Sequence, residues 1–290
     1  MDRKWTLNDS LEYTHWLATH HYENFHVVSF LLPKKLHQDF YNVYSFCRWA
    51  DDLGDEIGDK RESLRLLDWW SVELDAMYAG ETRHPVFIAL KTTVERHGIP
   101  RQPFADLIRA FVQDQQVARY QTWEGVLDYC VYSANPVGRL VLYLGGYQDA
   151  ERQRLSDCTC TALQLANFWQ DVTVDLLKDR VYIPLEVMER NQYTVEELFA
   201  RKMNPNFRRV MVEIADRAQA LFEQGLPLAR MVDRRLSIDL DLFSRGGMRV
   251  LEKIRQQDYD VLSRRPAISK LERVRLLLGS LTRMTLGRGV

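Results

Sequence analysis

The chain has 290 residues, a formal net charge of −1, 46% hydrophobic residues and 27% charged residues, which is an ordinary globular balance. The near-neutral charge argues against a general nucleic-acid binder, because such proteins carry a basic surface. The four scattered cysteines (Cys47, Cys130, Cys158 and Cys160) indicate reduced thiols in a cytoplasmic protein. The N-terminus lacks the apolar core of a signal peptide, and no apolar run reaches the roughly 18 residues of a membrane span.

Helical periodicity runs through nearly the whole chain. Apolar residues recur at three- and four-residue spacing, as over 106–120 and 207–224. We find no convincing alternating strands, no fixed-period repeat and no low-complexity linker. Turn-forming residues separate the helical segments at 79–85, 97–103, 144–149, 203–206, 245–247 and 263–266. We therefore predict about ten or more helices packed as one all-α domain over residues 1–290.

The first segment with chemical interest is 40–56, FYNVYSFCRWADDLGDE, a largely apolar helix with an acidic end. Its polar residues are spaced by four, three and four, so they share one face: Tyr44, Arg48, Asp51 and Asp55. Asp52 points about 100° away from Asp51, because a helix has 3.6 residues per turn. Taken alone, the segment fits a solvated helix end with an arginine–aspartate pair equally well.

A second polar stripe is predicted within residues 160–184, CTALQLANFWQDVTVDLLKDRVYIP. Spacings of three, four, four, three and four put it on one face of a helix about five turns long: Gln164, Asn167, Asp171, Asp175, Lys178 and Tyr182. Facing carboxylates repel unless cations lie between them, and a set of oxygen ligands suits a hard cation such as Mg²⁺ with a diphosphate. The two stripes therefore predict a metal–diphosphate clamp, with Arg48, Lys178 or Arg180 adding positive charge. Two unrelated solvated faces are the alternative.

The segments YSFCRWADDLGDE and LQLANFWQDVTVDLLKDRVYIP resemble both halves of the signature of the squalene/phytoene synthase family, and the likeness covers roughly residues 20–265. The resemblance implies an all-α prenyl synthase fold with a central cavity and Mg²⁺-dependent ionisation of a prenyl diphosphate. It places Asp51 and Asp55 in a first aspartate motif, and Asn167, Asp171 and Asp175 in a second. It also implies positions around the diphosphate for Tyr44, Arg48, Gln164, Arg180 and Tyr129, the last within LDYCVYSANPVG.

Four departures from the family pattern narrow this resemblance. Tyr22 and Asn24 stand where two serines are usual, and Gln170 stands where an arginine precedes the second motif. Asn135-Pro136 replaces part of an Ala-Gly-x-Val-Gly segment, and Gly246-Gly247 replaces a frequent tyrosine. These variants resemble the hydroxysqualene synthases of bacterial hopanoid pathways. That resemblance implies presqualene diphosphate as substrate and hydroxysqualene as product.

Two alternatives remain open from the sequence. One is head-to-head condensation of farnesyl diphosphate to presqualene diphosphate, squalene or dehydrosqualene. The other is a non-catalytic lipid-binding or assembly factor, although such a relative is expected to lose some of the four aspartates retained here.

Further expectations concern apolar residues and the carboxyl end. Seven apolar residues could line the cavity, and ordinary core packing explains them equally well: Phe25, Val27, Val28, Phe30, Leu31, Leu140 and Leu144. Pro136 is expected to kink a helix, and the freed carbonyl or Asn135 could then hold a water, with a kink of no chemical role as the alternative. The basic segment 268–290 carries a stripe of Ile268, Leu271, Val274, Leu278 and Leu281. It suits peripheral contact with the inner leaflet of a membrane, or packing as a last helix.

Overall fold

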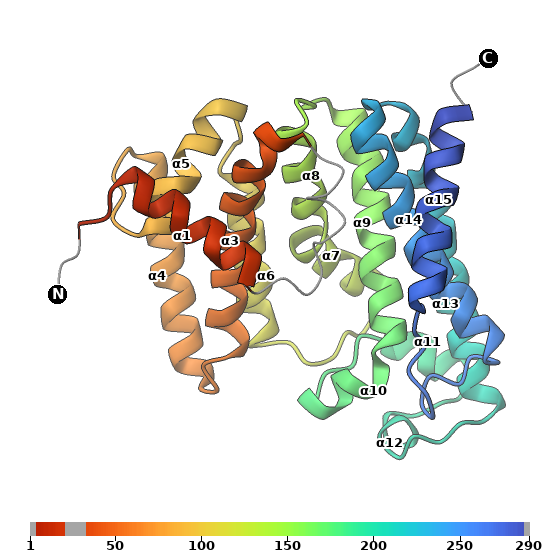
Figure 1. The fold of residues 1–290 in the computed structure, drawn as a ribbon. Helices are drawn as coiled ribbons and strands as arrows, with labels where there is room; N and C mark the ends of the chain where they lie inside the picture. Colours follow the sequence, from red (N-terminus) through yellow and green to blue (C-terminus); the bar gives the residue numbers. More distant parts are fainter. Residues whose placement is uncertain (1–3, 21–32, 287–290) are drawn as a thin grey trace. The chain divides into compact units, whose positions relative to one another are not determined.

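The computed structural model describes residues 4–20 and 33–286. These residues form helices, joined by loops and one isolated bridge between Arg119 and Val181, and they contain no strand (Figure 1). The predicted all-α class is confirmed. The chain divides into two compact units, one of residues 1–116 and 136–153 and one of residues 117–135 and 154–290. Each unit is described by itself below.

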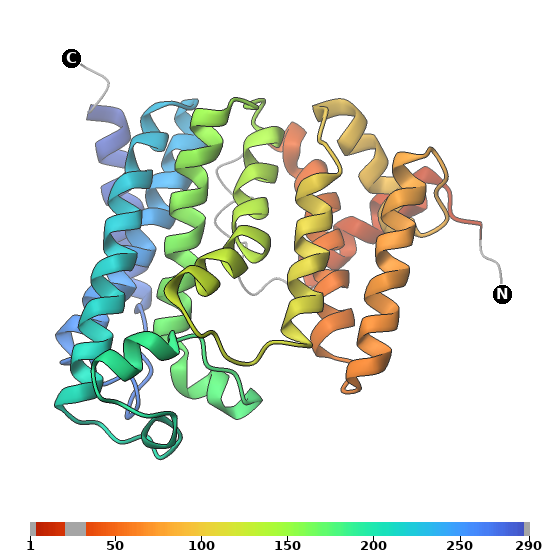
Figure 2. The same ribbon diagram turned by 180° about the vertical axis from the view of Figure 1, so that it is seen from behind.

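The first unit is a bundle around the long helix α3. Its helices are α1 (Leu7–His20), α3 (Lys34–Asp55), α4 (Lys60–Tyr78), α5 (Pro85–His97), α6 (Gln102–Asp114) and most of α8 (Asn135–Leu144). Figure 2 shows α4 and α6 from behind, where they lie side by side. Phe46 of α3 is fully buried, with ring centroids 4.9 Å from Phe104 and 5.7 Å from Trp70. This aromatic core fixes the face of α3 that turns inward, and so leaves its polar stripe on the other side.

The core-packing explanation holds for Leu140 and Leu144, which are buried in the hydrophobic core of the first unit. The other five candidates of that set lie within 21–32, outside the described residues, as do Tyr22 and Asn24.

The second unit carries the second motif on a group of long helices. It contains α7 (Trp123–Ser133), most of α9 (Ala150–Gln170), α10 (Val172–Asp175), the 3₁₀ helix η1 (Leu176–Lys178), α11 (Leu185–Arg190), α12 (Val195–Phe199), α13 (Pro205–Gly225), the 3₁₀ helix η2 (Leu226–Arg230), α14 (Arg234–Gln256) and α15 (Lys270–Leu286). Helices α9, α13, α14 and α15 lie side by side in both views (Figures 1 and 2).

The helix starts follow from side-chain caps. Asp59, Thr122 and Asn204 each accept a hydrogen bond from a backbone N–H in the first turn of the helix that follows. Thr194 and Glu197 form a reciprocal capping box at α12. Among these caps, only Asn204 lies in a predicted turn segment, 203–206. The predicted turn at 245–247 is wrong, because α14 continues through Gly246 and Gly247.

The helical run is interrupted beside Pro136, but as a break into two helices at Ala134 and not as the predicted kink within one helix. Helix α7 ends at Ser133 and α8 begins at Asn135, so Pro136 lies in the first turn of a new helix. A proline removes no intrahelical hydrogen bond there, because the first N–H groups of a helix have no carbonyl partner within it.

Two further expectations concern the thiols and the membrane. All four cysteines are free thiols, and burial raises the pKa of Cys47 and of Cys130 to about 12. Within the described ranges, no helix combines the length and the apolar character that a membrane crossing requires.

Candidate functional site

The predicted polar stripe on α3 is present. The Arg48 guanidinium lies 3.4 Å from Asp51 and 2.5 Å from Asp52, measured between the nearest nitrogen and oxygen atoms. Burial raises the pKa of the Tyr44 hydroxyl, Arg48 lowers it, and Asp51 and Asp52 raise it, so these four groups share one electrostatic environment. Asp52, which the helical phase placed off the stripe, joins it because the long arginine side chain reaches both carboxylates.

The acidic end of α3 is held in place by its neighbours. The carbonyl of Gly54 accepts hydrogen bonds from Gln115 Nε2 at 2.9 Å and from Ser63 Oγ at 3.4 Å. A Cβ at Gly54 would lie 3.5 Å from the Phe111 ring, an ordinary contact, so α6 packs closely here. Asp55, the last residue of α3, is exposed beyond this anchored turn.

The second stripe does not lie on one five-turn helix, as the spacing predicted. Helix α9 ends at Gln170, Asp171 is the N-cap residue of the short helix α10, and η1 ends at Lys178. Asp179 then adopts a left-handed conformation with φ 56°, and the Arg180 N–H turns back to donate to the Asp175 carbonyl at 3.0 Å. A turn follows Lys178, so Tyr182 does not continue the helical stripe.

The break at Asp171 is local. Its N–H still donates to the Asn167 carbonyl at 2.9 Å, and the N–H of Asp175 donates to the Asp171 carbonyl at 2.9 Å. Consequently Asn167, Asp171 and Asp175 still follow one another at one-turn intervals, as the second motif requires. Gln164 precedes them on α9 and is half-buried.

Two contacts at the second motif were not predicted from the sequence. The guanidinium of Arg265 donates to both carboxylate oxygens of Asp171, from Nη2 at 3.1 Å and from Nε in a shorter bond. Next to it, Gln170 Nε2 donates to the Pro266 carbonyl at 2.5 Å. The connection between α14 and α15 is thus bound to the end of α9, 94 residues away in sequence from Asp171.

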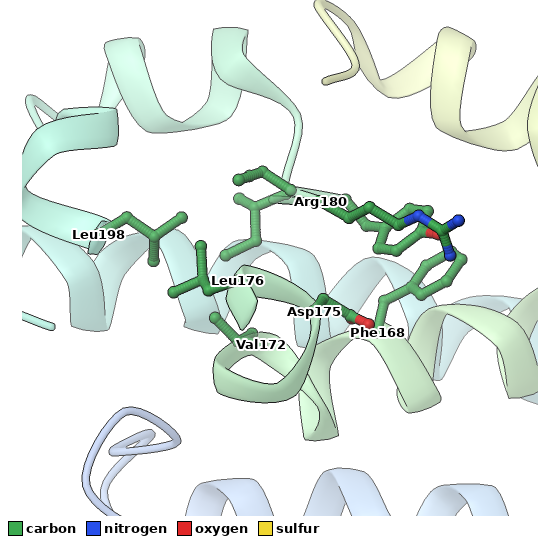
Figure 3. A pocket seen from close by; sticks show the side chains of 9 residues that line it. Phe168, Val172, Asp175, Leu176, Arg180 and Leu198 are labelled. Carbon is green, nitrogen blue, oxygen red and sulfur yellow. The ribbon is translucent and has the colours of Figure 1, made fainter. Parts of the chain in front are cut away.

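A pocket lies directly beside the second motif (Figure 3). Asp175 and Arg180 line one end, next to Phe168, and Val172, Leu176 and Leu198 line the apolar other end. The pocket therefore offers a carboxylate and a guanidinium together with an apolar wall.

Tyr129 belongs to an aromatic cluster that also contains two residues lining the pocket, Phe168 and Tyr182. The rings of Phe168 and Tyr182 stack at 3.7 Å between centroids, and Tyr129 lies 5.8 Å from Tyr182 and 6.1 Å from Phe168. Tyr120 completes the cluster at 5.6 Å from Tyr129. The sequence motif named Tyr129 alone. Tyr182 was predicted as the last residue of the second stripe, and Phe168 was not among the predicted site residues.

The side chain of Asn135 is 5% exposed, and its Oδ1 accepts a hydrogen bond from Thr161 Oγ1 at 2.9 Å. Asn135 is therefore held against α9 by a defined contact. Its position at the start of α8 follows from the helix break at Ala134.

The donor chemistry of the two motifs fits a hard cation. Both consist of carboxylate and amide oxygens, which Mg²⁺ prefers, with further ligands expected from substrate phosphates and water. Among the residues that the structure describes, no group of three or more His, Cys, Asp or Glu forms a ready metal cluster. The buried Nε of Arg48 has no hydrogen-bond partner among them either, so the first motif holds an unused donor suited to an anion.

Comparison with known proteins identifies this arrangement as that of a prenyl-diphosphate enzyme with an all-α isoprenoid synthase fold. The sequence profile of the squalene/phytoene synthase family matches residues 18–272, and the chain belongs to this family. The crystal structure of squalene synthase HpnC from Alicyclobacillus acidocaldarius is 45% identical, with a TM-score of 0.84, over 87% of this chain and 95% of that one.

Two curated relatives carry different activities. A hydroxysqualene synthase from Rhodopseudomonas palustris is 32% identical over 93% of each chain. A phytoene synthase from Thermus thermophilus is also 32% identical, over 89% of this chain and 87% of its own. The family acts on prenyl diphosphates.

Proposed function

We propose that the protein is a hydroxysqualene synthase that ionises presqualene diphosphate, allows the cation to rearrange and captures it with water. The observation that carries this proposal is Gln170, which stands where the family usually has an arginine before the second motif. Its side chain binds the Pro266 carbonyl, so this position contributes no charge to a diphosphate. Condensing two farnesyl diphosphates requires a site for two diphosphates, whereas presqualene diphosphate brings only one. Fewer cationic groups suit the single-diphosphate reaction.

The residues of the two motifs divide the work of ionisation. We assign Asp51, Asp55, Asn167, Asp171 and Asp175 to holding Mg²⁺. When bound, Mg²⁺ neutralises the charge that develops on the departing diphosphate. Supporting positive charge and hydrogen bonds are assigned to Arg48, Tyr44, Gln164, Lys178 and Arg180. Stabilising a developing charge with fixed groups is the largest single contribution in many enzymes.

The aromatic cluster suits the cation that remains after ionisation. Tyr129, Phe168 and Tyr182 lie together beside Asp175, and the faces of aromatic rings attract positive charge. We assign to this cluster the stabilisation of the carbocation while bulk water is excluded. Asn135, fixed by Thr161, is assigned to placing the one water that ends the reaction.

The lack of a nicotinamide-binding sequence pattern also supports capture by water. The sequence contains no G-x-G-x-x-G segment after a strand, the pattern of a nicotinamide-binding loop. Hydride must then come from elsewhere, and water is the available nucleophile.

Supplying each substrate separately, with Mg²⁺ and without a reductant, tests the proposal. We expect presqualene diphosphate to be consumed to an alcohol and farnesyl diphosphate to remain. Rapid turnover of farnesyl diphosphate alone to presqualene diphosphate or a C30 hydrocarbon would support the condensing alternative. If geranylgeranyl diphosphate is the substrate consumed, the chain shares the activity named for its Thermus relative.

The metal assignment is tested with Asp51→Asn and Asp175→Asn. Each is expected to slow diphosphate release by about a hundredfold or more, by analogy with the loss of one preorganised charge-stabilising group. The melting temperature should hold or rise, because repulsion between carboxylates falls. Nearly full activity in either variant, or in excess chelator, would contradict the metal assignment.

We further propose that α15 contacts an anionic membrane surface. Its exposed apolar stripe consists of Leu271, Val274 and Leu278, which are 60%, 53% and 57% exposed. The exposed side chains of Lys270 and Arg275 lie on either side of this stripe by helical phase. A stripe of this kind with flanking cations is typical of an interfacial helix, and a C30 substrate itself partitions into membranes.

The other face of α15 accounts for its packing on α14. Glu272 pairs with Arg249 and, at 3.0 Å, with Lys253, and Arg283 Nη2 donates to Asp241 at 2.8 Å. The polar face thus holds the helix in place and leaves the apolar stripe exposed. Ile268 and Leu281, the ends of the predicted stripe, are half-buried.

Replacing Leu271, Val274 and Leu278 by serine leaves those ion pairs intact. We expect this variant to lose binding to vesicles that contain anionic lipid, while Val72→Ser, a change at a 57% exposed site on α4, retains it. Equal co-sedimentation of the stripe variant and the wild type would refute contact through α15. Loss of self-association in place of vesicle binding would assign the stripe to a second copy of the chain.

A further inference from the structure

The connection between α14 and α15, residues 257–269, is internally braced. Gln257 Nε2 donates to the carbonyls of Asp260 at 2.8 Å and Arg264 at 3.0 Å, and the Ser263 N–H donates to Asp260 Oδ1 at 2.9 Å. Pro266 is buried although its neighbours in the chain are exposed. The segment therefore has a defined shape that presents Arg265 at a fixed place.

From this position, Arg265 forms a bidentate ion pair with Asp171. The guanidinium donates to both carboxylate oxygens, and the Asp171 side chain is only 15% exposed. The neighbouring bond from Gln170 to the Pro266 carbonyl fastens the same two segments by a neutral contact. A bidentate arginine–carboxylate pair is among the stronger and more directional ionic contacts in proteins.

We infer that Arg265 competes with the metal ion for Asp171 and thereby sets the metal affinity of the second motif. This inference rests on the proposed role of Asp171 as a metal ligand. A guanidinium bound to both oxygens of a carboxylate weakens its hold on a divalent cation, since the two cations repel each other and each draws on the same negative charge. Arg265 is thus a positioning residue: it neutralises and orients Asp171 until the metal arrives, and then withdraws.

The hydrogen bond between Gln170 and the Pro266 carbonyl can hold the segment in place while the metal ion replaces Arg265 at Asp171. It involves no charged group, so arrival of a metal at Asp171 does not oppose it. The segment can remain attached through Pro266 while the arginine side chain moves, and the exchange can therefore reverse when the metal leaves.

The direct test measures metal binding in the absence of prenyl substrate. Mn²⁺ serves as the probe, with inorganic pyrophosphate present, and free Mn²⁺ is counted by electron paramagnetic resonance. Arg265→Gln is expected to tighten Mn²⁺ binding about two- to fivefold, the equivalent of a partly exposed ion pair removed from competition. Arg265→Lys, which keeps the charge without the two-pronged geometry, should give a smaller change.

Arg264→Gln is the matched control. It removes the same charge one residue away, from an exposed side chain. Its Mn²⁺ affinity should equal that of the wild type. Unchanged or weaker binding in Arg265→Gln overturns the inference, and equal tightening in both variants overturns it too, because a general charge effect would then explain the result.

Hydrogen exchange of residues 257–269 gives a second readout. Arg265 adds a second attachment to the one that Gln170 provides, so Mn²⁺ with pyrophosphate should speed exchange in the wild-type segment modestly, to the rate of Arg265→Gln, which should not respond to Mn²⁺. Asp171→Asn distinguishes failure of the proposed metal site from failure of the proposed competition by Arg265. If it binds Mn²⁺ as the wild type does, the proposed metal site fails. If it binds weakly while Arg265→Gln is unchanged, only the competition fails.

Discussion

The two adjacent glycines on α14, Gly246 and Gly247, have opposite surroundings and predict opposite effects of one added methyl group. A Cβ on Gly247 would overlap the Phe222 ring, with Cε1 at 2.8 Å, and would lie 2.9 Å from Leu163 Cδ2 on α9. A Cβ on Gly246 would meet no atom within 4 Å. Gly247 therefore lets α14 approach α13 and α9 closely, whereas Gly246 makes no such contact.

Two contributions determine the change in unfolding free energy. Replacing glycine by alanine inside a helix stabilises by roughly 0.5–1 kcal/mol, and this gain is common to both sites. Overpacking a filled core costs about 1–3 kcal/mol and applies only to Gly247. We expect Gly246→Ala to be slightly more stable than the wild type, and Gly247→Ala to be about 1–3 kcal/mol less stable than Gly246→Ala.

Thermal melts of both variants followed by circular dichroism measure this difference. At roughly 2–4 °C for each kcal/mol in a chain of this size class, the two melting temperatures should differ by several degrees. If Gly247→Ala melts at or above Gly246→Ala, the packing of α14 on Phe222 and Leu163 described above is wrong.

Two predictions concern pH and are checked by melts across the pH range. Burial, with the charge of Asp233, raises the pKa of Asp239 from 3.8 to about 8, so the folded chain keeps a proton that the unfolded chain releases. Unfolding free energy therefore falls as pH rises from about 4 to 8. Asp239→Asn should remove this fall and be more stable than the wild type at pH 8 by a few kcal/mol at most. Asp241→Asn, which loses the charge paired with Arg283, should instead lower the unfolding free energy. The same sign for both variants would refute the assignment. Burial lowers the pKa of His84 from 6.5 to about 4, so stability is lost as pH falls through that window. His84→Asn keeps an acceptor for the Val86 N–H and should reduce this loss of unfolding free energy at low pH. An unchanged dependence of the melting temperature on pH would contradict this role of His84.

The α3 stripe could be predicted because one uninterrupted helix carries it, so spacing alone fixes the shared face. The second stripe was right as far as Asp175 and wrong beyond it, because the left-handed residue Asp179 reverses the chain and no local signal specified that turn. The pairing of Asp171 with Arg265 is a long-range contact, 94 residues apart, which helical periodicity cannot reveal. The interruption beside Pro136 was predicted as a kink and not as a full break, because no glycine marks the helix end at Ala134.

In the proposed reaction, water captures the cation that is formed from presqualene diphosphate. The most direct measurement supplies that substrate with Mg²⁺ in heavy-oxygen water, without a nicotinamide, and analyses the products by mass spectrometry beside a parallel run with NADPH. We predict an alcohol that carries the heavy oxygen in both runs, in equal amount. Squalene formed only with NADPH, and no labelled alcohol in either run, would contradict the account and identify the chain as a complete squalene synthase.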